Sequence, residues 1–143
     1  MKKKVIIGYT TGVFDLFHVG HVRILKKAKS LCDKLIVGVS TDTVVKKYKN
    51  KKPIIPYSER VEVIKNSKYV DMVVPQNTLD KFISWKKLKY DIILVGDDWF
   101  ASKKWRLLDK RFKELGVRII YLPYTKKTSS TKINNILNQY RKK

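Results

Sequence analysis

Both histidines of the chain lie in one short segment, His18-Val19-Gly20-His21. An apolar, β-branched run from Val5 to Tyr9 precedes it and an amphipathic run from Val22 to Leu31 follows it, which predicts a turn that opens a helix. A helix N-terminus offers unpaired backbone N–H groups and a partial positive charge, both of which favour phosphate. Imidazole N–H groups placed there would donate further hydrogen bonds to phosphate oxygens. The segment therefore predicts a binding site for nucleotide phosphates.

A metal site is the main alternative for this segment, because histidines three residues apart can share a metal ion. Asp15 is the only further ligand nearby, and Cys32 is the only cysteine in the chain. A structural zinc site is therefore less favoured than contact with phosphate. Asp15 itself could cap the turn, stabilise the loop or associate with magnesium, and the sequence leaves these roles open.

Two further segments carry polar side chains at positions suited to chemistry. Gly96-Asp97-Asp98-Trp99 is either a turn that caps the next helix or a carboxylate and an indole that bind a base, a ribose or a second substrate. The segment from Tyr124 to Lys132 has five serine and threonine side chains and several lysines just before a helix. It is either a polar loop with a helix cap or a second phosphate-binding helix N-terminus.

Short β-rich runs alternate with helical runs along the whole chain. Strands are predicted at 5–10, 35–40, 70–74, 91–95 and 117–122, and helices at 20–32, 42–48, 58–67, 79–88, 104–115 and from 129 or 130 to about 140. Ser58 is expected to cap the third helix, Pro75 to end the third strand and Gly116 to end the fifth helix. The alternation predicts one α/β domain over residues 1–143, with a doubly wound, five-stranded parallel sheet. In such a sheet the three polar segments would meet at the carboxyl ends of the strands.

The chain is strongly basic, with 33 Lys and Arg against 12 Asp and Glu and a formal net charge of +21. This charge could bind nucleic acid, steer phosphorylated substrates, or simply solvate the outer faces of helices. The lysines are spread along all 143 residues and no nucleic-acid-binding motif is present, which favours solvated faces over nucleic acid. The apolar runs are far shorter than the roughly 20 residues of a membrane span, so a cytoplasmic protein is expected.

Four segments together resemble a known family. The residues from Gly12 to His21 are similar to the GxFDxxHxGH signature of the cytidylyltransferases, which belong to the HxGH nucleotidyltransferases. The stretch from Lys68 to Pro75 resembles their RYVDEVV stretch. Gly96 to Trp99 matches the GDDW of the glycerol-3-phosphate branch, and Ser129 to Lys132 resembles the end of its RTEGISTTK motif. The resemblance covers nearly the whole chain, in order.

The resemblance implies a Rossmann-like HxGH fold and transfer of CMP from CTP to sn-glycerol 3-phosphate, giving CDP-glycerol and pyrophosphate. The acceptor phosphate would attack the α-phosphorus in line, without a covalent enzyme intermediate. Mg²⁺ is expected as the partner of CTP, with no protein ligand assigned to it. The alternatives are another acceptor such as choline phosphate or a polyol phosphate, an adenylyltransferase that uses ATP, and a non-catalytic nucleotide-sensing or nucleic-acid-binding domain.

The resemblance also assigns site residues. The expected catalytic residues are His18, His21 and Lys51. The nucleotide would contact these two histidines and Val13, Phe14, Asp15, Gly20, Gly96, Asp98, Tyr124, Thr125, Ser129, Ser130 and Thr131. The acceptor would contact Lys47, Lys49, Arg60, Lys81 and Trp99.

Two departures from the family pattern bear on these assignments. Tyr124 replaces an arginine that contacts the triphosphate in the family, and Lys127 replaces a glycine, so Lys126 or Lys127 would have to supply the missing charge. Lys68 replaces the arginine of RYVDEVV, a stretch that helps to form a dimer interface in relatives. A homodimer with altered contacts is therefore expected.

Overall fold

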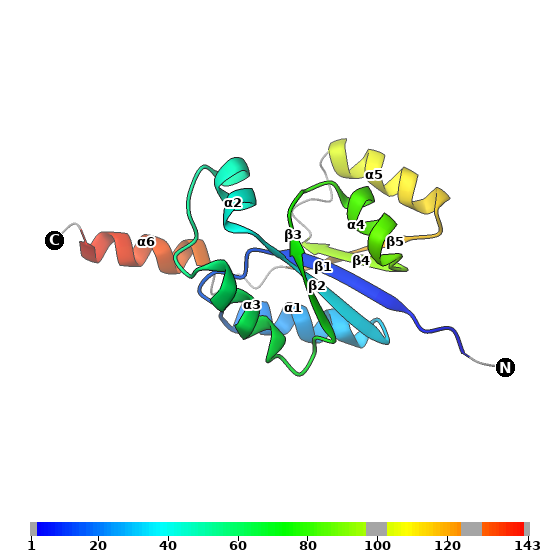
Figure 1. Ribbon diagram of the computed structural model, residues 1–143, viewed down its shortest axis with the longest axis horizontal. Coiled ribbons are helices and arrows are strands. Elements are labelled where there is room, and N and C mark those ends of the chain that lie inside the picture. The colour runs from blue at the N-terminus through cyan, green and yellow to red at the C-terminus, as the bar shows by residue number, and fades with distance from the viewer. Residues whose placement is uncertain (1–2, 97–102, 124–129, 142–143) are drawn as a thin grey trace.

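The computed structural model describes residues 3–96, 103–123 and 130–141, and the predicted α/β fold is confirmed. Five parallel strands form one sheet in the order β3-β2-β1-β4-β5 (Figure 1). The strands are β1 (Ile7–Gly12), β2 (Lys34–Ser40), β3 (Met72–Gln76), β4 (Ile92–Gly96) and β5 (Arg118–Leu122). The chain builds the sheet outward from β1 in one direction and then returns to place β4 on the other side of β1. The switch in strand order therefore lies between β1 and β4, where ligands of doubly wound sheets bind.

Six helices accompany the sheet within the described residues. They are α1 (Val19–Ser30), α2 (Asp42–Lys49), α3 (Tyr57–Lys65), α4 (Lys81–Leu88), α5 (Lys103–Glu114) and α6 (Ser130–Arg141). Figure 1 shows α1 and α3 on one face of the sheet and α4 and α5 on the other, while α6 extends away from the body. None of the described helices is long and apolar enough to cross a membrane.

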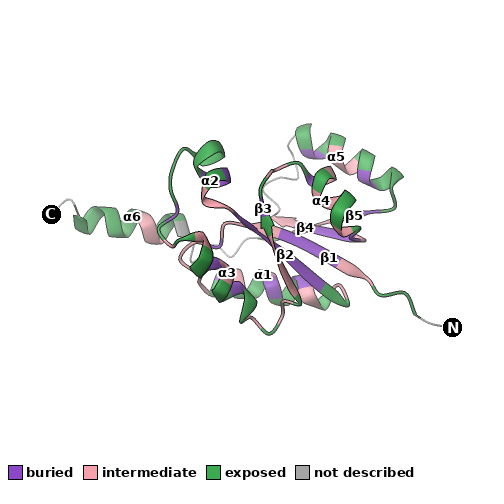
Figure 2. Cartoon of the chain, in the orientation of Figure 1, coloured by how far each residue is buried: buried purple, intermediate pink, exposed green. Residues whose placement is uncertain are grey.

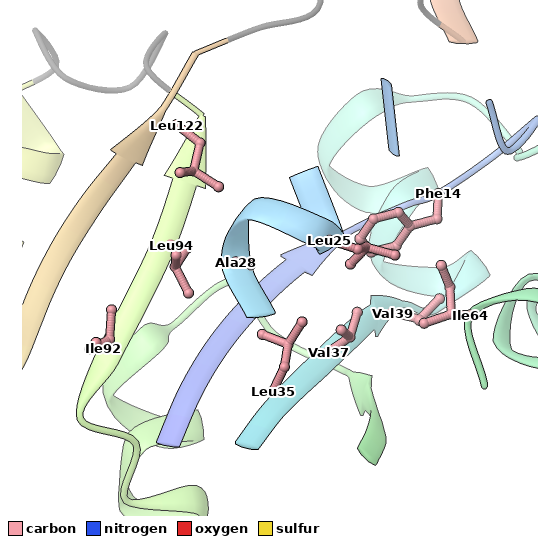
Figure 3. Close-up of a cluster of buried hydrophobic side chains, with 10 residues drawn as sticks. All are labelled: Phe14, Leu25, Ala28, Leu35, Val37, Val39, Ile64, Ile92, Leu94 and Leu122. Carbon is pink, nitrogen blue, oxygen red and sulfur yellow. The ribbon is translucent and has the colours of Figure 1, made fainter. Parts of the chain in front are cut away.

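Alternate residues of the central strands supply the two halves of the core. Leu35, Val37 and Val39 face α1 and α3 together with Leu25 and Ile64 of those helices (Figure 3). The neighbouring strand residues Ile36 and Ile93 instead join the cluster on the other face, with Trp105 and Phe112 of α5. Figure 2 shows this burial concentrated in the sheet and on the inner sides of the helices. Burial on both faces is what the continuous apolar strands of a parallel sheet require.

Of the three residues expected to start or end an element, two predictions are wrong and one is confirmed. Pro75 does not end the third strand, because β3 is the edge strand and a residue without an N–H is tolerated there. Ser58 does not cap the third helix: α3 begins one residue earlier, at Tyr57, after Pro56, with no side-chain cap. Gly116 does end the fifth helix, with a φ of 77° that a residue with a side chain rarely adopts.

Candidate active site

The two histidines fix each other at the first turn of α1, beside the carboxyl end of β1. His18 caps the helix, and its Nδ1 accepts a hydrogen bond from the backbone N–H of Gly20 at 3.0 Å. In return, Nδ1 of His21 accepts a hydrogen bond from the backbone N–H of His18 at 3.2 Å. Because both Nδ1 atoms act as acceptors, the network assigns the hydrogen of each neutral ring to Nε2. Each histidine therefore keeps one N–H donor for a ligand.

Both rings are neutral at neutral pH. Burial, with a smaller contribution from His18, lowers the pKa of His21 from 6.5 to about 4, although Asp15 acts in the opposite direction. Partial burial also lowers the pKa of His18. The two ring centroids lie 4.0 Å apart, so a protonated pair would be penalised further. The site thus presents two adjacent neutral donors at a helix N-terminus, an arrangement suited to phosphate oxygens.

Two phenylalanines hold the ring of His21. Phe17 stacks on it with a centroid separation of 5.3 Å, and Phe14 packs edge-on at 5.4 Å. The ring of Phe14 folds back over Gly12, where an added Cβ would lie only 2.9 Å from a ring carbon. A side chain at position 12 would displace Phe14 and with it the histidine, which accounts for the glycine.

The turn between β1 and α1 is strained and is held by a distant loop. Phe14 and Leu16 adopt left-handed backbone conformations, with φ of 55° and 50°, which cost side-chain-bearing residues on the order of 1–3 kcal/mol each. The two carboxylate oxygens of Asp15 accept hydrogen bonds from the backbone N–H groups of Ile54 and Ile55, both at 2.9 Å. Of the roles left open for Asp15, the structure supports the stabilisation of a loop.

Arg60 is buried among backbone carbonyls beside the histidine turn. Its side chain is fully buried and donates to the carbonyls of Val13 at 2.7 Å, Ser40 at 2.8 Å and Ile55 at 2.9 Å. It also forms an ion pair with Asp42 at 2.6 Å. These contacts give Arg60 a structural role, in which one guanidinium joins the turn, the end of β2 and the loop before α3. Its contact with the acceptor stays a prediction.

Lys81 is nearly buried, with 9% of its surface exposed, and lies at the first position of α4. Its Nζ donates to the hydroxyl of Thr11, at the carboxyl end of β1, at 2.9 Å. No described carboxylate forms an ion pair with this ammonium. Burial, and secondarily the charge of Lys104, lower the pKa of Lys81 to about 8. A buried cation whose only partner among the described side chains is a hydroxyl is costly unless an anion completes its surroundings.

The remaining predicted lysines are exposed near the end of α2. Lys47 and Lys49 lie in the last turns of the helix and Lys51 follows it. The hydrogen bonds from Ile54 and Ile55 to Asp15 fasten the same loop to the histidine turn. The structure therefore connects the segment of Lys51 to the histidines, although no contact between them is described.

The other predicted residues are only partly described. Gly96 ends β4 beside β1, and Thr131 is exposed on the first turn of α6. Ser130 begins α6, and the structure describes its backbone but not its side chain. Outside the described residues lie Asp98, Trp99, Tyr124, Thr125 and Ser129. Within the described chain, no three histidine, cysteine or carboxylate side chains converge to hold a metal ion.

A family model described as cytidylyltransferase-like matches residues 9–136, which is most of the chain and includes the histidine turn, β4 and the start of α6. The chain belongs to the cytidylyltransferase-like family of nucleotidyltransferases. The family was predicted from the sequence motifs, and this match confirms it.

Relatives of this cytidylyltransferase-like protein carry more than one name. The FAD synthase of Pyrococcus abyssi is 40% identical over 141 residues, which span 95% of this chain and 90% of that protein. The glycerol-3-phosphate cytidylyltransferase of Bacillus subtilis is 37% identical over 138 residues, which span 92% and 94% of the two chains. Among solved structures, a lipopolysaccharide core biosynthesis protein from Thermoplasma volcanium is similar with a TM-score of 0.71 and 29% identity, and the match covers 87% of this chain and 100% of that one.

Sequence reasoning missed several residues that shape the site of this family member. One of them is Thr11, the hydrogen-bond partner of Lys81. Its position directly before the predicted turn, with a hydroxyl side chain, could have indicated a role in the site. Nothing in the sequence indicates that Arg60 is buried, because an arginine on a polar helix is ordinarily exposed. Asp42, which pairs with Arg60, was predicted only as the start of a short helix.

Proposed function

We propose that the protein transfers CMP from CTP to sn-glycerol 3-phosphate, producing CDP-glycerol and pyrophosphate. The observation that carries the proposal is the pairing of two sites at the carboxyl end of β1. One is the pair of neutral Nε2–H donors on His18 and His21, suited to a triphosphate. The other is the buried ammonium of Lys81, which lacks a described counter-ion and suits the phosphate of an acceptor.

The proposed reaction needs no general base. A phosphate monoester is already anionic at neutral pH, so one of its oxygens attacks the α-phosphorus directly. The new P–O bond forms as the bond to pyrophosphate breaks on the opposite side, and no proton has to move. Neutral histidines fit this chemistry, because they donate hydrogen bonds to the changing phosphate charge rather than accept a proton.

Positive charges near the site complete the proposed mechanism. Lys81 orients the acceptor phosphate through its Nζ, which Thr11 already positions. Lys51, which precedes the Ile54 and Ile55 amides that Asp15 holds, neutralises the charge of the departing pyrophosphate. Mg²⁺ bound to CTP would supply further positive charge, with no described residue assigned to hold it. Such charges act mainly by position and by stabilising the transition state.

The choice of glycerol phosphate rests on the GDDW segment at Gly96 to Trp99 and on relatives named glycerol-3-phosphate cytidylyltransferase, at 37% and 40% identity. A second candidate is adenylyl transfer from ATP to FMN. It is favoured by relatives named FAD synthase, at 40% and 41% identity over 95% and 96% of the chain. Both reactions join a nucleotide to a phosphate monoester, so the same histidines and Lys81 serve either.

A matrix of substrates separates these reactions. Pyrophosphate release is measured with CTP or ATP, each paired with sn-glycerol 3-phosphate, choline phosphate, a polyol phosphate or FMN. Release with CTP and sn-glycerol 3-phosphate, together with CDP-glycerol identified by mass, supports the proposal. Release only with ATP and FMN establishes the second candidate instead. The His18→Ala variant is the control for contaminating activity.

A further inference from the structure

Three hydroxyl groups converge beside the first turn of α4. The hydroxyls of Tyr90 and Ser84 each donate to the backbone carbonyl of Lys81, both at 2.8 Å. These two oxygens lie 3.3 Å apart, and Ser84 also hydrogen-bonds to the hydroxyl of Tyr9. Tyr9 and Tyr90 are each only 1% exposed. The hydroxyl cluster, formed by Tyr9, Ser84 and Tyr90, therefore holds the backbone of the residue whose side chain carries the buried ammonium.

The hydroxyl cluster exceeds what α4 needs for its own hydrogen bonds. A carbonyl in the first turn of a helix ordinarily accepts from the N–H four residues later, so two further donors on the carbonyl of Lys81 are additional. Asp80 caps the same turn through Oδ1, which accepts from the N–H groups of Phe82 at 2.9 Å and Ile83 at 3.4 Å. The helix start is thus capped without any tyrosine. The extra contacts fix where the first residue of α4 lies.

The surrounding strands give the hydroxyl cluster a fixed place. The ring of Tyr9, in β1, stacks on the ring of Tyr90 with a centroid separation of 4.8 Å. A Cβ at Gly38, in β2, would lie 2.5 Å from the Tyr9 hydroxyl, so this glycine leaves the space that the hydroxyl occupies. Burial raises the pKa of Tyr9 to about 12 and also raises the pKa of Tyr90. Both hydroxyls therefore keep their protons at neutral pH and can donate.

Lys81 is consequently held at both ends. The hydroxyl cluster holds its carbonyl, while the hydroxyl of Thr11 in β1 accepts from its Nζ at 2.9 Å. A lysine side chain is long and flexible, so the place of its ammonium depends on where its backbone is fixed. A shift of the first turn of α4 would separate Nζ from Thr11 and let water reach the charge.

We propose that Tyr90 is a positioning residue for the transfer reaction, which places the ammonium of Lys81, and through it the acceptor phosphate, at the carboxyl end of β1. This role rests on the proposed function, because it takes Lys81 as the contact for the acceptor phosphate. It is the same for sn-glycerol 3-phosphate and for FMN, since both present a phosphate monoester. Tyr90 itself touches no substrate and acts through the backbone of Lys81.

The protonation of Lys81 reports on its position. Burial lowers the pKa of Lys81 to about 8, and the charge of Lys104 on α5 acts in the same direction. Asp80 precedes Lys81 in the chain, but no ion pair joins the two among the described residues. If the first turn of α4 loosens and water reaches the ammonium, the pKa should rise toward its usual 10.5. A substitution that merely weakens the fold would leave this pKa unchanged in the folded protein.

The first test uses the protein without substrate. Lysines are isotope-labelled at Cε, and the NMR signal of Lys81 is assigned by its loss in Lys81→Met. Tyr90→Phe should move the titration midpoint of this signal upward by about 0.5–1 pH unit. Tyr69→Phe, the matched control, removes a hydroxyl from a partly buried ring that packs on the other core cluster, and should leave the midpoint unchanged. Circular dichroism verifies that the variants are folded. A midpoint that neither Tyr90→Phe nor Ser84→Ala moves overturns the proposal.

A double-mutant cycle, measured by pyrophosphate release, is the second test. Tyr90→Phe should lower kcat/KM for the acceptor by about 10-fold and change the KM for the nucleotide by less than about 2-fold. In the Lys81→Met background the same substitution should change kcat/KM by less than about 2-fold, because no ammonium is left to place. Equal losses in the two backgrounds overturn the proposal. Absence of pyrophosphate release from every substrate pair contradicts the proposed function instead, and the NMR titration still decides whether Tyr90 places Lys81.

Discussion

The backbone N–H of His18 donates to Nδ1 of His21, so the first histidine of the turn sets the orientation and the tautomer of the second. The same rings are the proposed phosphate donors. Position 21 therefore combines two functions in one ring: Nδ1 stabilises the helix start, and Nε2–H is the proposed donor to phosphate. These functions reside on different atoms, and substitutions can separate them.

His21→Asn and His21→Ala separate these two functions. The Oδ1 atom of asparagine can still accept from the N–H of His18, so His21→Asn should retain the free energy of unfolding to within about 0.5 kcal/mol. His21→Ala should lose about 1 kcal/mol of that free energy. Both variants lack the Nε2–H donor, and both should lose about 10²- to 10³-fold in kcat. Urea denaturation and pyrophosphate release measure the two effects. An active His21→Asn enzyme would contradict the assigned role.

Lys81→Met should make the protein more stable and less active. The pKa of Lys81 is lowered to about 8 by burial, so the folded state disfavours its charge at neutral pH. Removing that charge should raise the free energy of unfolding by about 1–3 kcal/mol, partly offset by loss of the Thr11 hydrogen bond. The kcat/KM for the acceptor should fall sharply, whereas the KM for CTP should change less. Lys87→Met, on the exposed side of α4, is the matched control and should change neither quantity.

The pH dependence of kcat/KM for the acceptor should have an alkaline limb near the pKa of Lys81, about 8. Above that pH the side chain loses the charge that attracts the acceptor phosphate. Stability should change in the opposite sense, since an unfolded lysine binds a proton up to about pH 10.4 and a folded one releases it earlier. The free energy of unfolding contributed by this group therefore rises between these two pKa values. A kcat/KM profile unchanged by Lys81→Met would exclude Lys81 as the source of the limb.

Arg60→Met should destabilise the protein by about 3–5 kcal/mol, because it leaves the carbonyls of Val13 and Ser40 and the carboxylate of Asp42 without their buried donor. Arg60→Lys should recover only part of this loss, since an ammonium cannot span three segments. Arg23→Met, at an exposed position of α1, should change the free energy of unfolding by less than about 0.5 kcal/mol. Thermal and urea denaturation report these differences. Equal effects at positions 23 and 60 would reject the structural role of Arg60.

Periodic patterns predicted most of the fold, because burial on a sheet or on a helix face repeats at fixed spacing. The strand around Leu35 to Ser40 and the helix stop at Gly116 follow from such local signals. The prediction for Pro75 is wrong because the effect of a proline depends on whether its strand is central or at the edge, and strand order is a property of the whole sheet. The start of α3 was misplaced because Pro56 opens the helix without the side-chain hydrogen bond expected from Ser58.

The candidate site was predictable where its residues are adjacent in sequence and less so where they meet through the fold. His18 and His21 share one turn, so their joint location was evident from spacing alone. Arg60 contacts the carbonyl of Val13, 47 positions away, and nothing local to either residue indicates that contact. The burial of Lys81 against Thr11 likewise arises only when α4 packs beside the end of β1.

The strained turn at Phe14 and Leu16 has a consequence for how the protein acquires activity during folding. Its hydrogen bonds to Ile54, Ile55 and Arg60 connect residues 39 to 47 positions apart, so β1 and α1 alone cannot hold it. The chain must close this loop, at an entropic cost, before the left-handed residues become stable. The histidine site therefore forms after the central strands have paired. A refolding chain becomes compact before it becomes active.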